Sequence, residues 1–487
     1  MTSVFASWHN PASEQTQNWF IGSVLLMITL LRSAAVIITP LELGVDEAQY
    51  WLWSQTPDFG YFTKPPLIAW LIGVSHWLLG HHTWAVRLPA CWIHFGTSLL
   101  LWQAALWLYG QRAGRLTAMI WITLPAIGLG SFVISTDTPL LAFWSAGLLA
   151  ICGIVSGRLT ATTGMVLAGS AFGVAVLAKY AGIYALASLF LIILHGYAGH
   201  QQLFSWRHFL LAIIAFGLFA SPNIIWNFTN DFVSFRHLGD NANIQQHSAS
   251  FDGVWQFIGS QFVVAGPLTF VVMLIGATSS FRNKQTLWLF WMWAPVFALM
   301  AVQSYLSEAN ANWAMTAFPA LTLLAAGWLS NQKRYFRIAT VGINISLSLF
   351  ILIVTIAGSM GPLTPKSDPL RRLRGWQQLS EDLRPVIAAH GASAIIADLR
   401  PTASLLSWHF YATDLRILVH DKDGVPSNHF EANHKWSPQP GRRLIALTGE
   451  ATPPTLPGVN WVRPFTTTSI KISQNKTRQF TVYRGIE

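Results

Sequence analysis

The sequence predicts a mainly α-helical membrane protein of about 11–13 transmembrane helices with a small C-terminal α/β domain. Of its 487 residues, 52% are hydrophobic and only 10% are charged, whereas about a quarter of the residues in a soluble domain are charged. Eleven apolar stretches approach or exceed the length of about 20 residues that crosses a bilayer. From Gly361 the composition becomes mixed and polar, which predicts a membrane domain at 1–360 and a soluble domain at 361–487.

The predicted spans follow one another with short connections. They are residues 19–40, 84–108, 115–133, 138–156, 163–178, 181–195, 208–227, 254–280, 286–306, 311–330 and 337–358. The first apolar stretch is too long for the core of a signal peptide and has no lysine or arginine before it, so we expect it to be retained as a span. Residues 65–80 form a shorter apolar segment that we expect to lie along the membrane surface.

The charges predict how these spans are oriented. With the N-terminus inside, the inner loops are basic and contain no acidic residue; they hold Arg112, Arg115, Arg158, Arg207, Arg282, Lys284, Lys333, Arg334 and Arg337. The acidic residues between positions 15 and 360 all fall on the outer side: Glu42, Asp46, Glu47, Asp58, Asp137, Asp231, Asp240, Asp252 and Glu308. An odd number of spans places the C-terminal domain outside as well. Any chemistry is therefore expected on the outer face.

Other function classes find little support. The net charge of +10 comes from basic residues interleaved with apolar runs, a pattern that suits an anionic membrane surface and predicts no nucleic-acid partner. Cys91 and Cys152 fall inside apolar spans, which argues against a disulfide or a metal cluster. No phosphate-loop, dinucleotide-binding or HExxH motif is present. In the C-terminal domain, a helix is predicted from Trp376 to Ala389, and buried strands at 394–397 and 444–447.

The first outer loop carries the strongest candidates for chemistry. Asp46 and Glu47 are adjacent carboxylates at a membrane boundary, where holding a charge is costly, so a proton-accepting or metal-binding role competes with plain helix capping. Lys64 precedes Pro65-Pro66, which stiffen the loop. It is interpreted either as a phosphate-binding ammonium or as a lysine that snorkels to the membrane surface.

Later outer segments supply further candidates. Asp137 lies in Ser135-Thr136-Asp137-Thr138-Pro139, a sequence typical of a helix start with Asp137 or Thr138 as N-cap. Lys179 interrupts an apolar stretch on the side where lysine is disfavoured, which indicates an anionic partner. The segment from Glu308 to Trp313 and the pair Arg236-His237 are weaker candidates, since a polar turn with an interfacial tryptophan and a solvated loop are common.

In this order, residues 40–330 resemble the GT-C glycosyltransferases of the protein O-mannosyltransferase and aminoarabinose transferase type. The resemblance is carried by the acidic pair, Tyr61-Phe62-Thr63-Lys64-Pro65-Pro66-Leu67, Thr136-Asp137-Thr138-Pro139, Lys179, and Glu308 through Trp313. In the tail, Asp368-Pro369-Leu370 and Gly375-Trp376 are similar to the start of the outer domain in bacterial members.

The resemblance implies an inverting transfer of one sugar from a polyprenyl-phosphate donor to a lipid, glycan or protein acceptor. It also implies a multi-pass protein of the bacterial inner membrane, with the active site and the C-terminal domain facing the periplasm or the exterior. Asp46 would be the catalytic base or a carboxylate that orients the acceptor, with Glu47 as its support, and Lys64 and Lys179 would hold the donor phosphate. Asp137 and Tyr61 would bind the donor sugar or orient the site, and the acceptor side would include Glu308, Asn312, Arg236 and His237.

One position departs from the aminoarabinose transferases. These carry a glutamate directly before the loop lysine, where it can contribute to a metal site, and Thr63 stands there in this chain. No cofactor is therefore required by the pattern, although a divalent metal stays open. Two other functions remain alternatives. One is a transporter or flippase for lipid-linked sugars, which should show paired repeats or interrupted spans near the midplane and should bind its cargo from both sides. The other is a catalytically inactive binding protein on the same fold.

Overall fold

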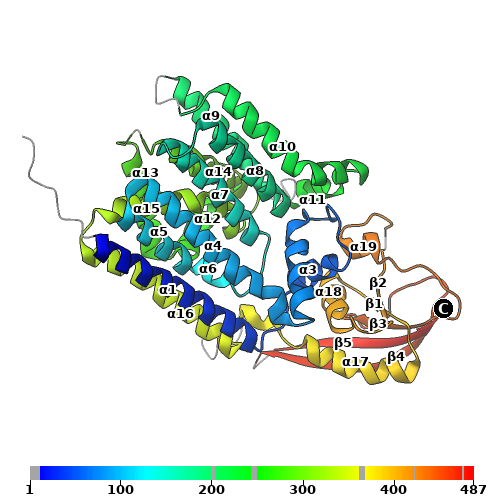
Figure 1. The fold of residues 1–487 in the computed structure, drawn as a ribbon. Coiled ribbons are helices and arrows are strands. Elements are labelled where there is room, and N and C mark those ends of the chain that lie inside the picture. The colour runs from blue at the N-terminus through cyan, green and yellow to red at the C-terminus, as the bar shows by residue number, and fades with distance from the viewer. Residues whose placement is uncertain are drawn as a thin grey trace, which may run out of the picture.

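The structure is a computed structural model that describes residues 11–198, 203–242, 249–283, 285–360, 368–421, 423–473 and 476–487. A bundle of long helices forms the larger part, and a smaller domain with a five-stranded sheet packs against one end of it (Figure 1). The bundle is built from α1 (Pro11–Ile38), α2 (Val45–Ser54), α3 (Leu67–Leu79), α4 (Thr83–Tyr109), α5 (Gln111–Thr123), α6 (Pro125–Gly130), α7 (Asp137–Val155), α8 (Ala161–Ala178), η1 (Tyr180–Ile183), α9 (Tyr184–Tyr197), α10 (Trp206–Thr229), α11 (Val233–Ala242), α12 (Phe251–Ala265), α13 (Pro267–Ser280), α14 (Trp288–Leu306), η3 (Ala311–Ala317), α15 (Phe318–Ser330) and α16 (Arg334–Ala357).

Helices occupy all eleven stretches that were predicted as spans, but by length and composition only eight of them in the described part of the chain, or nine with the bent pair α12 and α13, could cross a membrane. In the described residues, eight helical segments are long and apolar enough to cross a membrane. They coincide with the predicted spans at 19–40, 138–156, 163–178, 181–195, 208–227, 286–306, 311–330 and 337–358. The remaining three predicted spans correspond to α4, an unbroken helix of 27 residues, and to two interrupted segments. The apolar segment at 65–80 forms the short helix α3.

The two interrupted segments correct the expectation of straight spans at 115–133 and 254–280. Leu124 has an extended ψ of 133° and separates α5 from α6, because the residue before a proline avoids the helical region. Between α12 and α13 the chain turns by 107° at Gly266, whose φ is +85° and which precedes Pro267. A glycine adopts this φ without strain, and the proline then starts the next helix.

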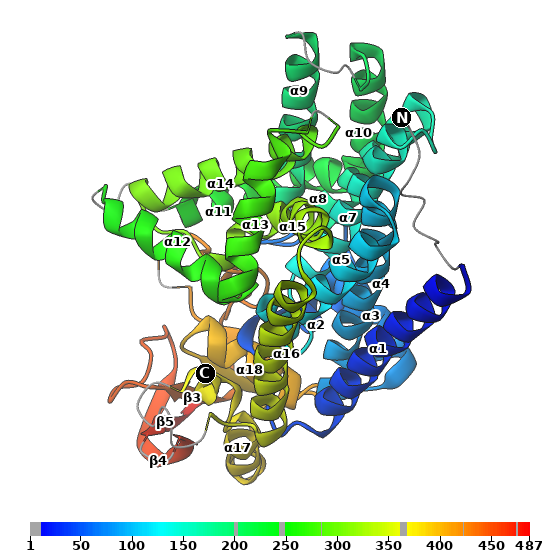
Figure 2. The same ribbon diagram turned by 90° about the vertical axis from the view of Figure 1, so that its left-hand side faces the viewer.

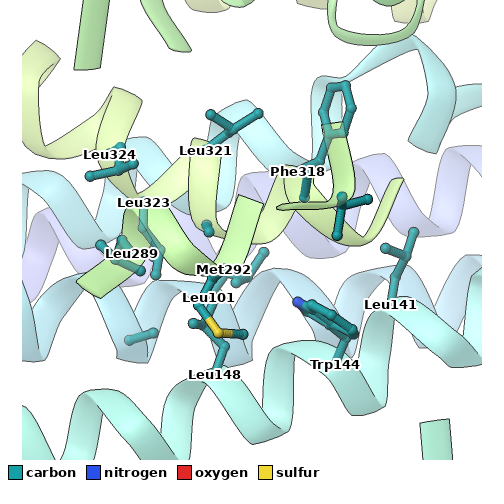
Figure 3. Close-up of a cluster of buried hydrophobic side chains, with 14 of the residues drawn as sticks. Leu101, Leu141, Trp144, Leu148, Leu289, Met292, Phe318, Leu321, Leu323 and Leu324 are labelled. Carbon is teal, nitrogen blue, oxygen red and sulfur yellow. The ribbon is translucent and has the colours of Figure 1, made fainter. Parts of the chain in front are cut away.

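The bundle core is made by helices that approach one another closely. Leu148 of α7 lies beside Leu101 of α4 (Figure 3), and Trp144 of α7 and Phe318 of α15 belong to the same buried cluster. Between α8 and α10, a Cβ added at Gly169 would lie only 2.2 Å from the carbonyl oxygen of Ala212. Small residues that let backbones touch are the usual device of membrane helix packing. This packing fixes the ends of α7 and α8, on which two candidate site residues lie.

The C-terminal domain confirms the predicted α/β class. It contains η5 (Pro369–Leu373), α17 (Trp376–His390), β1 (Ala394–Ala397), α18 (Arg400–His409), β2 (Arg416–Val419), α19 (His429–Asn433), β3 (Arg443–Thr448), β4 (Asn460–Ser473) and β5 (Lys476–Ile486). The strand order is β2-β1-β3-β5-β4, with β1 parallel to both neighbours and β5 antiparallel to β3 and β4. The predicted helix and both predicted strands are confirmed, whereas the predicted boundary at 360/361 adjoins residues 361–367, which lie outside the described part of the chain.

The C-terminal domain docks on α2, with α18 lying between the sheet and the bundle (Figures 1 and 2). Trp51 of α2 packs edge-on against Trp408 of α18, with ring centroids 4.8 Å apart. Glu42 contributes a polar anchor, since its two carboxylate oxygens accept hydrogen bonds of 2.8 Å from the backbone N–H groups of Gly375 and Gln377. These groups lie at the N-terminus of α17, where a carboxylate is favoured. The two domains therefore share one hydrophobic cluster and one charged anchor.

Candidate active site

A polar cavity of about 420 Å³ lies where α2, α7, the end of α8 and the segment before η3 meet. Its walls are Asp46, Tyr50, Lys64, Ser135, Thr136, Asp137, Lys179, Ser307, Glu308, Asn310, Asn312 and Trp313. Six of the ten residues singled out from the sequence line it: Asp46, Lys64, Asp137, Lys179, Glu308 and Asn312. Another cavity, of about 470 Å³ beside α7 and α8, has an apolar lining and none of these six residues.

Asp46 lies in the first turn of α2 and meets the C-terminal domain. Its Oδ1 atom forms an ion pair with the guanidinium of Arg400, the first residue of α18, which also donates to the side-chain oxygen of Gln49. The Asp46 side chain is 63% exposed and that of Arg400 is 36% exposed. The Oδ2 atom of Asp46 has no hydrogen-bond partner among the described residues, so it can accept a proton or a hydrogen bond from a ligand.

Glu47 does not line the cavity, in contrast to its neighbour. Its side chain is only 1% exposed, and Arg87 of α4 binds both carboxylate oxygens at 2.9 and 2.7 Å. The carboxylate also accepts from the backbone N–H groups of Gly44, at 2.8 Å, and Ile134, at 3.1 Å. Glu47 thus closes a capping box at the start of α2 and ties that helix to the segment before α7. Its contacts hold in place the helix that carries Asp46, and its expected role as a support for Asp46 stays a prediction.

Asp137 connects three separate parts of the chain. Its Oδ1 atom accepts a 2.7 Å hydrogen bond from the Lys179 ammonium, and its Oδ2 atom accepts one of 2.6 Å from the Asn312 amide. The expected capping role is wrong, because Thr136 holds the N-cap position of α7 and no side chain caps this end. The carboxylate is used across the cavity wall instead, which brings the end of α8 and the segment before η3 to the start of α7.

The loop that carries Lys64 is held in place by hydrogen bonds and ring stacking of its other residues. The Tyr61 hydroxyl donates to the Trp53 carbonyl at 2.9 Å, and the Tyr61 ring stacks on that of Trp53. The carbonyls of Phe59 and Tyr61 accept hydrogen bonds from Asn223 and Ser234, at 2.8 and 2.7 Å. Tyr61 itself does not line the cavity. Its contacts orient the loop that carries Lys64.

The Lys64 ammonium is unpaired: no residue in the described part of the chain forms a hydrogen bond or an ion pair with it. Burial lowers the pKa of Lys64 below its usual range, and the nearby positive charge of Lys179 lowers it further. Asp46 and Asp137 act in the opposite direction through their charge. A buried cation without a partner is costly, so the cavity presents a ready site for an anion.

The structure does not bring Arg236 and His237 into this cavity. The outer segment between the predicted spans at 208–227 and 254–280 forms the helix α11 over part of its length, and Arg236 there donates to the carbonyl of Asp231. The ring of His237 lies 5.9 Å from that of Phe62, the neighbour of the Lys64 loop. Neither residue lines the cavity, so the expected place of both on the acceptor side stays a prediction.

Two contributors to the site were missed from the sequence. Tyr50 follows Asp46 by one helical turn, and burial together with the charge of Asp46 raises its pKa well above the usual range, so its hydroxyl stays neutral. The i, i+4 spacing could have identified it once α2 was recognised as a helix. Arg400 had no such signal, because 354 residues separate it from Asp46.

The carboxylates of the site are not arranged as a metal centre. Among the residues that the structure describes, no three His, Cys, Asp or Glu side chains gather closely enough to hold a metal ion. Both oxygens of Asp137 are already engaged by Lys179 and Asn312, and Thr63 offers no carboxylate. The side chains present fit an anionic ligand better than a cation.

Comparisons with known proteins identify the family. Residues 63–226 match the family model described as dolichyl-phosphate-mannose-protein mannosyltransferase. The chain is 30% identical over 439 residues to the lipid A galacturonosyltransferase RgtD of Rhizobium johnstonii, covering 88% of this chain and 90% of the relative. It is 26% identical over 321 residues to the undecaprenyl phosphate-alpha-4-amino-4-deoxy-L-arabinose arabinosyl transferase of Pectobacterium atrosepticum, covering 61% of this chain and 55% of that relative.

Two solved structures of glycosyltransferases have a similar fold. ArnT from Cupriavidus metallidurans, solved with bound undecaprenyl phosphate, superposes with a TM-score of 0.69 at 13% identity, over 96% of this chain and 98% of that one. An oligosaccharyltransferase of Archaeoglobus fulgidus in its apo form superposes with a TM-score of 0.52 at 12% identity, over 91% of this chain and 70% of that one. With its membrane helices, its C-terminal sheet domain and a polar cavity lined by residues of the membrane domain, the chain belongs to the GT-C superfamily of membrane glycosyltransferases that use polyprenyl-phosphate-linked sugars.

Proposed function

We propose that this protein transfers a uronic acid sugar, of the galacturonosyl kind, from a polyprenyl-phosphate donor to a lipid A-type acceptor. The observation that carries the proposal is the unpaired ammonium of Lys64 in a polar cavity that also contains the carboxylate of Asp46. The similarity to a lipid A galacturonosyltransferase over 90% of that relative's length supports the choice of sugar and acceptor.

The two lysines suit the donor phosphate. A phosphodiester brings one negative charge, which compensates the unpaired Lys64 ammonium and is close enough to be shared with Lys179, whose charge already acts on Lys64. As the bond between the sugar and the phosphate breaks, negative charge grows on the leaving phosphate. Fixed cations at that place stabilise this charge more in the transition state than in the ground state, which is how electrostatic catalysis accelerates a reaction.

Asp46 is suited to the acceptor side of the same reaction. The acceptor hydroxyl oxygen attacks the anomeric carbon from the face opposite the phosphate, its proton passes to Asp46, and the carbon–oxygen bond to the phosphate breaks with inversion. Arg400 occupies Oδ1 of Asp46, so Oδ2 is the atom proposed to take the proton. Asp137 is proposed to orient the donor through its links to Lys179 and Asn312.

The choice of a uronic acid over an amino sugar rests on the relatives and on position 63. The relative that is 30% identical over most of the chain is a lipid A galacturonosyltransferase. An amino sugar would gain from a further carboxylate beside the loop lysine, where this chain has Thr63.

The site and the C-terminal domain are proposed to face the periplasm of a bacterial cell. In support, basic residues such as Arg112 and Arg337 gather at the other end of the bundle, where both donate to the Ser330 carbonyl. Cysteines introduced at Asp414, in the C-terminal domain, and at Asn283, between α13 and α14, should react with impermeant reagents from opposite sides of a membrane vesicle. Labelling of both from one side would refute this orientation.

The reaction is tested with the purified chain in lipid nanodiscs, lipid A as acceptor, and two donors that share one prenyl chain. We expect transfer from polyprenyl-phosphate galacturonic acid and little from polyprenyl-phosphate 4-amino-4-deoxyarabinose, followed by mass spectrometry of the lipid. The reverse preference would overturn the choice of sugar while keeping the enzyme class. Transfer of neither sugar to any lipid would overturn the proposal.

A further inference from the structure

A separate cavity of about 480 Å³ lies in the C-terminal domain, at the carboxyl ends of its parallel strands. It is lined by the last residues of β1, by His420 directly after β2, and by the residues that end and follow β3. From β1 the chain passes through α18 to β2 on one side of β1, and then crosses to β3 on the other side. The connections after β1 and β3 therefore diverge, which creates the crevice in which open parallel sheets commonly bind ligands.

Hydrogen bonds within the protein order the residues at the bottom of this cavity. Asp398, directly after β1, accepts a hydrogen bond of 3.0 Å from the backbone N–H of Gly449, after β3, and one of 3.2 Å from the Thr402 hydroxyl. The Thr448 hydroxyl accepts from the backbone N–H of Glu450 at 3.0 Å. Both diverging connections are thereby fixed, and a binding surface that is already ordered loses less entropy when it binds.

The side chains that remain are acceptors and small apolar surfaces. The Glu450 carboxylate and the hydroxyls of Thr452 and Thr455 have no partners among the described residues, and Pro453-Pro454 add an apolar wall. The lining contains no lysine or arginine. Such a surface repels anions and favours a ligand with many hydroxyls or an amine, together with apolar ring faces. A neutral or amino sugar has this chemistry.

The position of the cavity relates it to the reaction. Asp398 in its wall lies two residues before Arg400, at most about 7 Å along an extended chain, and Arg400 is the residue that pairs with Asp46. The donor phosphate is assigned to Lys64, in the loop before α3, and Lys179, directly after α8. A sugar bound at the carboxyl edge of the sheet thus approaches Asp46 from the side of the C-terminal domain, which is the direction open to an acceptor.

We propose that the carboxyl-edge cavity binds a neutral or amino sugar of the acceptor headgroup, at a point distant from the hydroxyl that becomes glycosylated. The inference rests on the proposed function for the identity of the acceptor. It assigns to the C-terminal domain a binding site that selects the acceptor by its glycan, in addition to the catalytic cavity.

Kinetics with the full-length chain in nanodiscs test the assignment. Glu450→Gln with Thr452→Val removes a charge and a hydroxyl at nearly constant volume, and Thr455→Trp fills the cavity. Each should raise the KM for the lipid acceptor about three- to ten-fold, the worth of one or two hydrogen bonds, with kcat and the KM for the donor unchanged. Asp414→Asn, an exposed carboxylate change in the same domain, is the matched control. Unchanged acceptor KM in both variants would overturn the proposal.

A binding measurement separates this proposal from the proposed reaction. A glucosamine disaccharide should give saturation-transfer NMR signals with the full-length chain, and Thr455→Trp should abolish them, whereas a galacturonate disaccharide should give none. This result is expected even if the enzyme transfers a sugar other than galacturonic acid. Equal signals from both disaccharides, or signals that survive Thr455→Trp, would refute the site. Competition by the free disaccharide against the lipid acceptor would show that the glycan alone, without the lipid, occupies it.

Discussion

Lys64 and Lys179 carry the same charge in the same cavity but differ in what balances it. Lys179 is paired with Asp137 at 2.7 Å, while Lys64 has no partner in the described residues. An anionic ligand therefore gains most at Lys64, where no protein carboxylate has to be displaced. Lys179 can share such a ligand only while Asp137 continues to hold it in position.

Replacing Lys64 by methionine should reduce sugar transfer by about 10²- to 10³-fold, the usual loss when one group that stabilises transition-state charge is removed. Methionine keeps most of the apolar stem, so the fold should be retained. Lys435→Met, which breaks an ion pair with Asp421 in the C-terminal domain, is the control and should leave transfer unchanged. Near-normal transfer by Lys64→Met would show that the phosphate is bound elsewhere.

The pH dependence of donor use should reveal the state of Lys64. Because burial lowers the pKa of Lys64, the ammonium loses its proton at lower pH than an exposed lysine would. Activity that needs the charged form is present below that pKa and is lost as the pH rises through it, so kcat/KM for the donor should show an alkaline limb below the ordinary lysine range. Lys64→Arg should move this limb to higher pH, since arginine stays charged. An identical limb in both proteins would assign it to another group.

Replacing Asp46 by asparagine keeps the shape and an oxygen that Arg400 can contact, but removes proton acceptance. Transfer should fall by roughly 10²- to 10⁴-fold, the range for general acid–base catalysis, with donor affinity nearly unchanged. Rates are followed by mass spectrometry of the product, and donor affinity by displacement of a labelled prenyl phosphate. A transfer rate close to that of the unchanged protein would mean that the acceptor arrives already ionised, with Asp46 as a positioning group.

The helix α2 separates two neighbouring carboxylates into different environments. Asp46 faces the cavity with a side chain that is 63% exposed, and Glu47, one residue later, is 1% exposed against Arg87. Glu47→Gln should lower the free energy of unfolding by roughly 3 kcal/mol, because it leaves a buried arginine without its counter-charge. Thermal unfolding in nanodiscs measures this, and Asp46→Asn should not shift the midpoint. The reverse order of the two effects would contradict the structural role of Glu47.

These contrasts indicate what the sequence could and could not predict. Long apolar stretches identified the spans, because crossing a bilayer requires a minimum length whatever the neighbouring helices are. Loops were harder: the sequence at 41–64 was interpreted as an outer loop, yet α2 forms there around buried tryptophans that pack against the C-terminal domain. The side chains of Asp46 and Glu47 differ in exposure because Arg87, 40 residues after Glu47, binds the Glu47 carboxylate. Such pairings follow from tertiary contacts and leave no local pattern.

Glu42 anchors the C-terminal domain to the membrane part through the N-terminus of α17. Glu42→Ala leaves two backbone N–H groups without their acceptor, so the domain should dock more loosely and Arg400 should meet Asp46 less often. We expect faster cleavage between the two domains in limited proteolysis, together with slower transfer. Glu381→Ala, on the exposed side of the same helix, is the control. Unchanged proteolysis and transfer would show that the hydrophobic cluster alone holds the domains together.

If transfer requires the contact between Asp46 and Arg400, that contact also sets the time at which the enzyme becomes active. These residues are 354 positions apart, so at a synthesis rate of about 5–20 residues per second roughly 18 to 70 seconds pass between their additions to the chain. Late in that interval the membrane helices, with Asp46, Lys64 and Lys179, have been made and can reach lipid-linked sugars. Arg400, at the start of α18, is still missing, so we expect the nascent protein to be unable to use them. Activity would then begin only when the last domain has been made and docked, which ties the start of glycan modification to the completion of the polypeptide.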